Sequence, residues 1–279
     1  MDGALSQLLQ LVSDPAFHDW MYTLALSLPR IMMVASFAPF FAPGVSGPLR
    51  LSLCLAFMLP LMPLTHFQTL QLLEDGNPGI LILAALILKE AFIGLLMGYV
   101  AGLVFYAAMN AGMIADNQRG ASQALGSDIL TGDQNSPFGS VLFLSMVVLF
   151  FSSGGCLAFV ALFYQSYAAW PVASMAPALW SSNASVLAAT GFNRMMELSL
   201  SIGAPFIIAA LLCDISLGLI NRFAPQLNVF VISMAVKSGI CAILALIFIS
   251  PFVGLGPLYI SEGGEMLKTL MTVLASSPI

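Results

Sequence analysis

The chain has 279 residues, of which 59% are hydrophobic and only 8% are charged. Soluble domains usually carry about 25% charged residues, so this composition excludes an ordinary water-exposed domain. It favours either a multispanning membrane protein or a subunit whose surface is mostly covered by partners. A net charge of −5 and the lack of any basic run argue against a nucleic-acid partner.

The first quarter of the chain predicts one short helix and then a helical hairpin. Residues 1–19 have the pattern of a short amphipathic helix, with no basic region typical of a cleavable signal peptide. Residues 20–42 are long and apolar enough to cross a bilayer, and Arg30 at their middle should face protein or water. Residues 51–65 predict a second, Pro-flanked helix that is marginal as a span, and residues 67–79 predict a polar loop.

Residues 80–115 predict a long apolar helix that leads directly into a polar segment at residues 116–137. Lys89 and Glu90 interrupt the apolar run. Small residues recur every four positions and therefore lie on one helix face, which predicts a close helix–helix seam. These are Gly94, Gly98 and Gly102.

The second half predicts three further apolar helical stretches. Residues 138–169 form an apolar run that is interrupted by Ser-Ser-Gly-Gly at 152–155, and a loop follows to about residue 184. Residues 186–221 predict a long helix, and residues 228–250 predict the last apolar helix. The Pro-containing run after residue 250 predicts a break before a short tail helix.

Charged residues inside these helices predict specific pairs. Arg194 and Glu197 are three apart and can pair along one helix. Asp214 and Lys237 lie at nearly the same height on either side of the predicted turn. A lone buried charge costs several kcal/mol, so we expect these two to face each other or a polar neighbour. The pair could be purely structural, or it could be a proton relay in a transporter.

Motifs for catalysis or metal binding are lacking. The four cysteines stand singly with no C-x-x-C, so neither a zinc site nor a disulfide framework is predicted. The sequence contains no G-x-S-x-G, no H-E-x-x-H and no phosphate-binding loop. Asp116, Asp128 and Asp133 are interpreted as solvated or capping residues rather than a catalytic pair. No cofactor is expected, and an intramembrane enzyme is the least favoured hypothesis.

Several segments together resemble one known family. The run AGMIADNQRGASQALGSDILTGDQNSPFG resembles the T subunit of type III secretion export apparatuses, the SctT family, which is related to flagellar FliR. LPRIMMVASFAPFF, SYAAWPV and APFIIAALLCDISLGLINRFAPQLNVFVISMAVKSG are similar to other segments of that family. The resemblance covers about residues 20–255. Arg119 and the Trp170-Pro171 pair look more like the injectisome branch than the flagellar branch.

The resemblance implies an all-α subunit of hydrophobic hairpins within a closed, pseudo-hexameric export gate in the bacterial inner membrane, lifted toward the periplasm. One T subunit would join several R- and S-type subunits, contact the switch subunit U and the export-gate subunit V, and let unfolded proteins pass. The chain would be one unit, with about 1–184 resembling an R subunit, about 185–260 resembling an S-subunit hairpin, and 261–279 as a tail. A small-solute or proton-coupled transporter is the alternative, with Arg30, Glu90, Asp214 and Lys237 as its membrane charges.

On the matched motifs, the residues expected to contact other subunits or to shape the gate fall in two groups. Those of the polar segment are Asp116, Gln118, Arg119, Gly120 and Asp128. Those of the hairpin turn are Pro225, Gln226 and Asn228.

Overall fold

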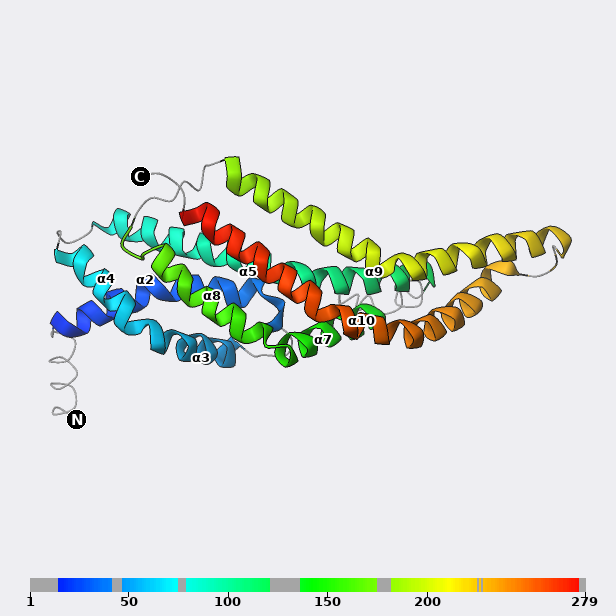
Figure 1. The fold of residues 1–279 in the computed structure, drawn as a ribbon, viewed down its shortest axis with the longest axis horizontal. Coiled ribbons are helices and arrows are strands. Elements are labelled where there is room, and N and C mark those ends of the chain that lie inside the picture. Colours follow the sequence, from blue (N-terminus) through cyan, green and yellow to red (C-terminus); the bar gives the residue numbers. More distant parts are fainter. Residues whose placement is uncertain are drawn as a thin grey trace, which may run out of the picture. The chain divides into compact units, whose positions relative to one another are not determined.

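A computed structural model gives the fold of the chain (Figure 1). It describes residues 15–41, 47–74, 79–120, 136–174, 182–224, 226 and 228–275. These residues form helices and short connections, with no strand among them, so the predicted all-α class is confirmed.

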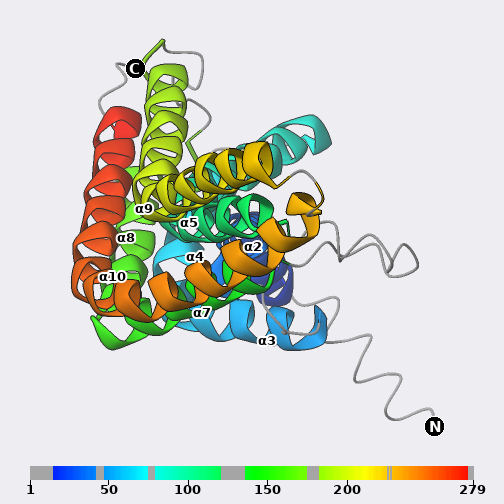
Figure 2. The same ribbon diagram turned by 90° about the vertical axis from the view of Figure 1, so that its right-hand side faces the viewer.

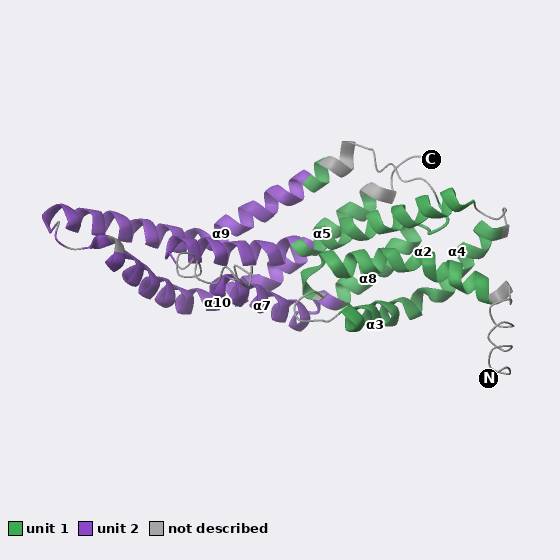
Figure 3. Cartoon of the chain, turned by 180° about the vertical axis from the view of Figure 1, so that it is seen from behind, with its two compact units in different colours: residues 1–102, 157–188, 264–279 green, residues 103–156, 189–263 purple. Residues whose placement is uncertain are grey.

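Contacts divide the chain into two compact units (Figure 3). Unit 1 comprises residues 1–102, 157–188 and 264–279, and unit 2 comprises residues 103–156 and 189–263. Three of the four boundaries fall inside long helices, namely α5 (Ile80–Gln118), α9 (Ser182–Phe223) and α10 (Val229–Ala275), and the fourth falls at the start of α8 (Gly155–Ala169). The division into R-like and S-like parts remains a prediction.

In unit 1, α2 (Pro15–Phe37) packs against α3 (Gly47–Met58) and α4 (Met62–Glu74). Two short 3₁₀ turns, η1 (Pro39–Phe41) and η2 (Leu59–Leu61), connect this group. The first part of α5 and most of α8 (Gly155–Ala169) complete the unit.

The predicted helix at 51–65 is part of a longer helical stretch, because the chain is helical from Gly47 through Glu74 apart from the η2 turn. The predicted polar loop is therefore wrong at residues 67–74, and residues 75–78 lie outside the described ranges. Pro60 and Pro63 each lie in the first turn of a helix, where a backbone N–H has no helical acceptor, so they begin helices instead of ending them. The stretch Gly47–Leu73 is long and apolar enough to count as one candidate membrane span.

Unit 2 contains α7 (Pro137–Ser152), the second part of α5 and most of α9 and α10. Its core gathers Ala115, Phe206 and Cys241, with the rings of Phe138 and Phe248 packed edge-on against Phe206. The helices α9 and α10 are joined at residues 224–228 and form a hairpin (Figure 2). The predicted break between α7 and α8 is confirmed, and Gly154 there has φ +78°, a conformation that favours glycine.

The predicted end of the last helix near residue 250 is wrong, because α10 continues through Pro251 and Pro257 to Ala275. A proline removes one helical hydrogen bond, but long apolar helices tolerate this where neighbouring helices support the backbone. Within unit 2, Phe252 is buried and Gly256 lies against the side chain of Leu149. The tail is therefore part of the same helix.

Five described helical stretches are long and apolar enough to cross a membrane, or six if the pair α7 and α8 counts as one broken span. The helix α5 extends beyond its predicted end to Gln118, so the polar segment begins on the last helical turn. Asp128 and Asp133 lie outside the described residues.

Candidate functional site

The seam between α2 and α5 brings two helix backbones into close contact in unit 1. A Cβ atom added at Gly94 would collide with the backbone carbonyl oxygen of Arg30. One added at Gly98 would lie 2.9 Å from Cβ of Phe37 and 3.1 Å from the carbonyl oxygen of Val34. Only glycine allows this approach at the two positions, and Gly102 on the same helix is also buried.

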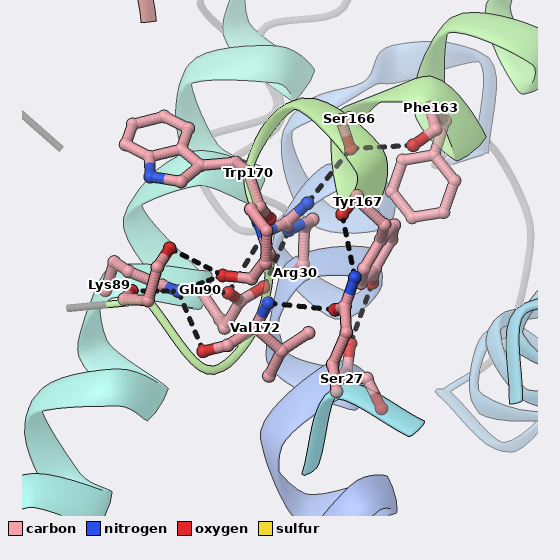
Figure 4. A network of polar contacts seen from close by, with 12 residues as sticks. Ser27, Arg30, Lys89, Glu90, Phe163, Ser166, Tyr167, Trp170 and Val172 are labelled. Carbon is pink, nitrogen blue, oxygen red and sulfur yellow. Dashed lines mark hydrogen bonds and ion pairs between the residues drawn. The ribbon is translucent and has the colours of Figure 1, made fainter. Parts of the chain in front are cut away.

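This close approach lets Arg30 of α2 reach Glu90 of α5 (Figure 4). The Nε of Arg30 donates to Oε2 of Glu90 at 2.6 Å, and its Nη2 donates to Oε1 at 2.9 Å. Both side chains are fully buried. The bidentate geometry is the strongest form of this ion pair and fixes the orientation of both groups.

The rest of the guanidinium is bound by the end of α8. Nη1 donates to Oγ of Ser166 at 3.1 Å, and Nη2 also donates to the carbonyl oxygen of Trp170 at 3.0 Å. The Arg30 guanidinium carbon lies 4.0 Å from the ring centre of Tyr167, and the Tyr167 hydroxyl donates to the carbonyl oxygen of Ser27 at 3.0 Å. The ring therefore adds a cation–π contact and links α8 back to α2.

Lys89 holds the segment that follows α8. Its Nζ lies 3.0 Å from each of three backbone carbonyl oxygens and 2.9 Å from Oε1 of Glu90. The carbonyls belong to Pro171, Val172 and Ser174. The Lys89 ammonium group has three N–H donors, and these four oxygens provide at least one acceptor for every donor.

Gln68 of α4 supports the same segment. Its Oε1 accepts from the backbone N–H of Val172 at 3.1 Å, and its Nε2 donates to the carbonyl oxygen of Tyr167 at 3.3 Å. The charged network thus joins α2, α4, α5 and α8 to one short segment at residues 170–174. Two cations and one carboxylate are almost completely paired, which describes a structural clamp and not a reactive centre.

A second polar cluster lies in unit 2, at the end of α5. The carboxylate of Asp116 accepts from the Ser136 hydroxyl and, at 2.9 Å, from the backbone N–H of Phe138. The Ser136 hydroxyl oxygen in turn accepts from Gly139 N–H at 2.9 Å and caps the start of α7. Asp116 therefore ties the end of one helix to the beginning of the next.

Arg119 lies beside this junction, with Nη2 2.5 Å from Oδ1 of Asp116. The two side chains line a small cavity with Phe138 and Cys241, and the buried Nε of Arg119 has no hydrogen-bond partner there. Gly120 follows with φ +78° and lies 3.4 Å, measured from an added Cβ, from the Met234 side chain. Gln118 is exposed.

The third charged group lies on the α9–α10 hairpin. Lys237 Nζ is 2.5 Å from Oδ1 of Asp214, so the predicted pairing of these residues is confirmed. In the chain by itself, the Asp214 side chain is 48% exposed and that of Lys237 is 13% exposed, so their burial remains a prediction for an assembly with partners. The predicted pair of Arg194 and Glu197 is also present, at 3.0 Å.

At the hairpin turn, Gln226 and Asn228 are exposed, and the Asn228 carbonyl oxygen accepts from the backbone N–H of Ile232 at 3.3 Å. Pro225 lies outside the described residues. Within the described ranges, no group of three His, Cys, Asp or Glu side chains could hold a metal ion.

Comparison with known proteins places this architecture in a family. The family model described as "Bacterial export proteins, family 1" matches residues 21–257. The chain belongs to this family. The match includes the Arg30–Glu90 clamp, the Asp116 junction and the charged hairpin.

Individual members of the export family are similar over different lengths. SpaR, a surface presentation of antigens protein from Salmonella typhimurium, is 30% identical over 237 residues, covering 84% of this chain and 85% of the relative. The Yop proteins translocation protein T from Yersinia pestis is 40% identical over 166 residues, covering 60% and 63%. FliR from Bacillus subtilis, a flagellar biosynthetic protein, is 28% identical over 162 residues, covering 58% and 62%. The chain thus spans less than two thirds of the Yersinia relative in that match.

The family consists of structural components of the type III secretion export apparatus and is not known as a family of enzymes. With its candidate spans, the chain is an inner-membrane protein.

Sequence reasoning found the charges of this export protein but not their arrangement. It singled out Arg30 and Glu90 without pairing them, and it gave no role to Lys89. Ser166, Tyr167 and Trp170 were only part of a matching segment, and nothing marked Gln68. The usable signal was the rule that a buried Arg needs a buried acid, since Glu90 is the acid inside the adjoining apolar helix.

Proposed function

We propose that this chain is a core component of the type III secretion export gate and forms, with R- and S-type subunits, the channel for unfolded proteins across the inner membrane. Its partners would be several copies of the R and S subunits in a pseudo-hexameric assembly, together with the switch subunit U and the export-gate subunit V. The assembly would be lifted toward the periplasmic side. Family membership along residues 21–257 supports this role.

The observation that carries the proposal is the surface of the α9–α10 hairpin. On α9, exposed apolar side chains recur with helical spacing and form one stripe, at Ile208, Leu211, Leu212, Ile215 and Leu219. Such a stripe is the kind of surface that another helix covers. Asp214 lies next to it and is half exposed, although it is paired with Lys237.

The half-exposed carboxylate favours a protein partner over lipid. A charged group facing hydrocarbon is costly, whereas helices of another subunit can offer hydrogen-bond donors. We therefore assign the stripe and its carboxylate to contact with an S-type or R-type subunit, in line with an S-like hairpin at 185–260 and an R-like part at 1–184.

The remaining motif residues take contact and gate-shaping roles in this proposal. Asp116 orders the junction that leads into the polar segment, and Arg119 and Gly120 lie at its start. Gln118, Asp128, Pro225, Gln226 and Asn228 would contact neighbouring subunits. None of them has a catalytic role.

Co-expression tests the proposal. We expect the tagged chain to co-purify with R- and S-type subunits in one stable complex that native mass spectrometry resolves. The single change Leu211→Arg in the stripe should abolish that complex, whereas Leu157→Arg at another exposed leucine on α8 serves as the matched control. A chain that stays monodisperse alone, or that conducts small solutes after reconstitution by itself, would contradict the proposal and favour the transporter alternative.

A further inference from the structure

A narrow apolar groove opens between α2, α3 and α8 in unit 1. It is bounded by Ile31, Val34 and Ala35 of α2, by Leu53, Cys54 and Phe57 of α3, and by Phe159, Val160 and Phe163 of α8. Its empty volume, including the open mouth, is about 410 Å³. The Tyr164 hydroxyl donates to the carbonyl oxygen of Phe57 at 3.1 Å and holds α8 to α3 beside it.

The one charged residue on the groove is Arg50. Its Nε is buried and has no hydrogen-bond partner, and no ion pair joins Arg50 to any described residue. A buried guanidinium nitrogen without an acceptor is costly, so this position calls for an anion or carbonyl from outside the chain.

The position of Arg50 on its helix strengthens this requirement. Arg50 lies in the first turn of α3, and that turn contains no acidic residue. The N-terminal end of a helix carries partial positive charge, so an arginine there adds to the local positive potential.

The position of Arg50 in a candidate membrane span suggests where its side chain would lie relative to a membrane. Arg50 is close to the start of the candidate span Gly47–Leu73, near one end of a long apolar stretch. Arginines at the ends of such stretches direct their head groups toward the lipid phosphates. The other residues that line the groove are apolar, apart from the thiol of Cys54.

We propose that this groove binds an anionic phospholipid, with one acyl chain between α3 and α8 and the phosphate on Arg50. The apolar lining contacts the methylene groups of the acyl chain, and the Arg50 guanidinium binds the phosphate by paired hydrogen bonds. Phosphatidylglycerol fits this chemistry. The inference needs only that the chain lies in a membrane, so it does not depend on the proposed channel.

Native mass spectrometry of the full chain released from nanodiscs tests the site, with equal amounts of phosphatidylglycerol and phosphatidylcholine. We expect phosphatidylglycerol to be retained preferentially. Arg50→Gln should weaken that retention by roughly five-fold, the equivalent of about 1 kcal/mol per basic residue near a lipid surface. Arg222→Gln, which changes another cation without an ion pair among the described residues, should have no effect.

A second pair of variants tests the binding of the acyl chain in the groove separately from the binding of the phosphate by Arg50. Val160→Phe should fill the groove and lower the retention of both lipids, while Val148→Phe, at a 65% exposed valine of α7, should not. Circular dichroism of each variant checks that the helices remain. Equal retention of the two lipids, equal behaviour of the Arg50 and Arg222 variants, or competition by inorganic phosphate alone would overturn the proposal. Complete loss of the lipid when R- and S-type subunits bind would also overturn it, because the groove would then be a subunit contact.

Discussion

Removing single charges from the buried cluster of Arg30, Lys89 and Glu90 should lower the free energy of unfolding by amounts that depend on which charge is left unpaired. The clamp holds two cations, Arg30 and Lys89, and one carboxylate, Glu90, so its net charge is about +1 in the folded chain. Glu90→Gln would leave two unneutralised cations side by side. Arg30→Met would leave the neutral pair of Lys89 and Glu90.

Breaking a buried ion pair by removing one partner typically costs about 3–5 kcal/mol. We expect Glu90→Gln to lie at the upper end of that range, because the cations of Arg30 and Lys89 both lose their counter-charge. Arg30→Met should cost less, since Glu90 keeps the charge of Lys89 on its Oε1, although Oε2 of Glu90, Ser166 and the Trp170 carbonyl each lose a donor. The double variant should cost at least about 1 kcal/mol less than the sum of the two single changes.

The assay is reversible unfolding of the purified chain in mixed detergent and SDS, followed by tryptophan fluorescence. Matched controls are Arg194→Met and Glu197→Gln, whose side chains are 42% and 66% exposed; Arg194 pairs with Glu197 and also with Glu262. Each control should change the free energy of unfolding by less than about 1 kcal/mol. The reasoning is refuted if Glu90→Gln is no worse than Glu197→Gln, or if Arg30→Met destabilises more than Glu90→Gln.

Three further changes test other parts of the molecule. Gly94→Ala should destabilise the chain by about 1–3 kcal/mol through the clash with the α2 backbone, whereas Gly218→Ala, with open space around it, should be neutral or slightly stabilising in the same unfolding assay. Arg119→Ala should impair or deregulate secretion while the chain still accumulates, as measured by secreted and cell-bound protein; normal secretion would mean that the polar segment is only a linker. Asp214→Asn should reduce recovery of the chain with its partner subunits, and the double change with Lys237→Met should be milder, since no unpaired ammonium remains; a double variant that is no milder would show that the two do not compensate each other.

Helix positions were predictable where apolar length and small-residue spacing controlled them. The seam at Gly94 and Gly98 follows from a four-residue repeat, and the pairing of Asp214 with Lys237 follows from equal distances to a turn. The helical structure of residues 67–74 was not predictable from local polarity, because their polar side chains were interpreted as a loop. The continuity of α10 through Pro251 depends on support from neighbouring helices, which a local pattern does not contain.

The clamp shows why the site was harder to predict than the fold. Arg30 and Glu90 are 60 residues apart, and nothing in either helix specifies the partner of the other. The acceptors of Lys89 are backbone carbonyls, which exist at every position and carry no residue identity. The residues that hold the segment after α8 therefore become visible only in three dimensions.

The distribution of ion pairs separates the charges that the chain satisfies itself from those that it does not. Among the residues that the structure describes, six of the eight basic side chains form ion pairs with acids, and Arg50 and Arg222 do not. Arg222 lies in the last turn of α9, where the negative end of the helix favours a cation, and its side chain is exposed. Arg50 has the opposite placement, at the positive end of α3 with a buried nitrogen and no acceptor. This unfavourable position in a chain with so few charges, beside an apolar groove, is the reason for our proposal that an anion with a hydrocarbon chain binds there.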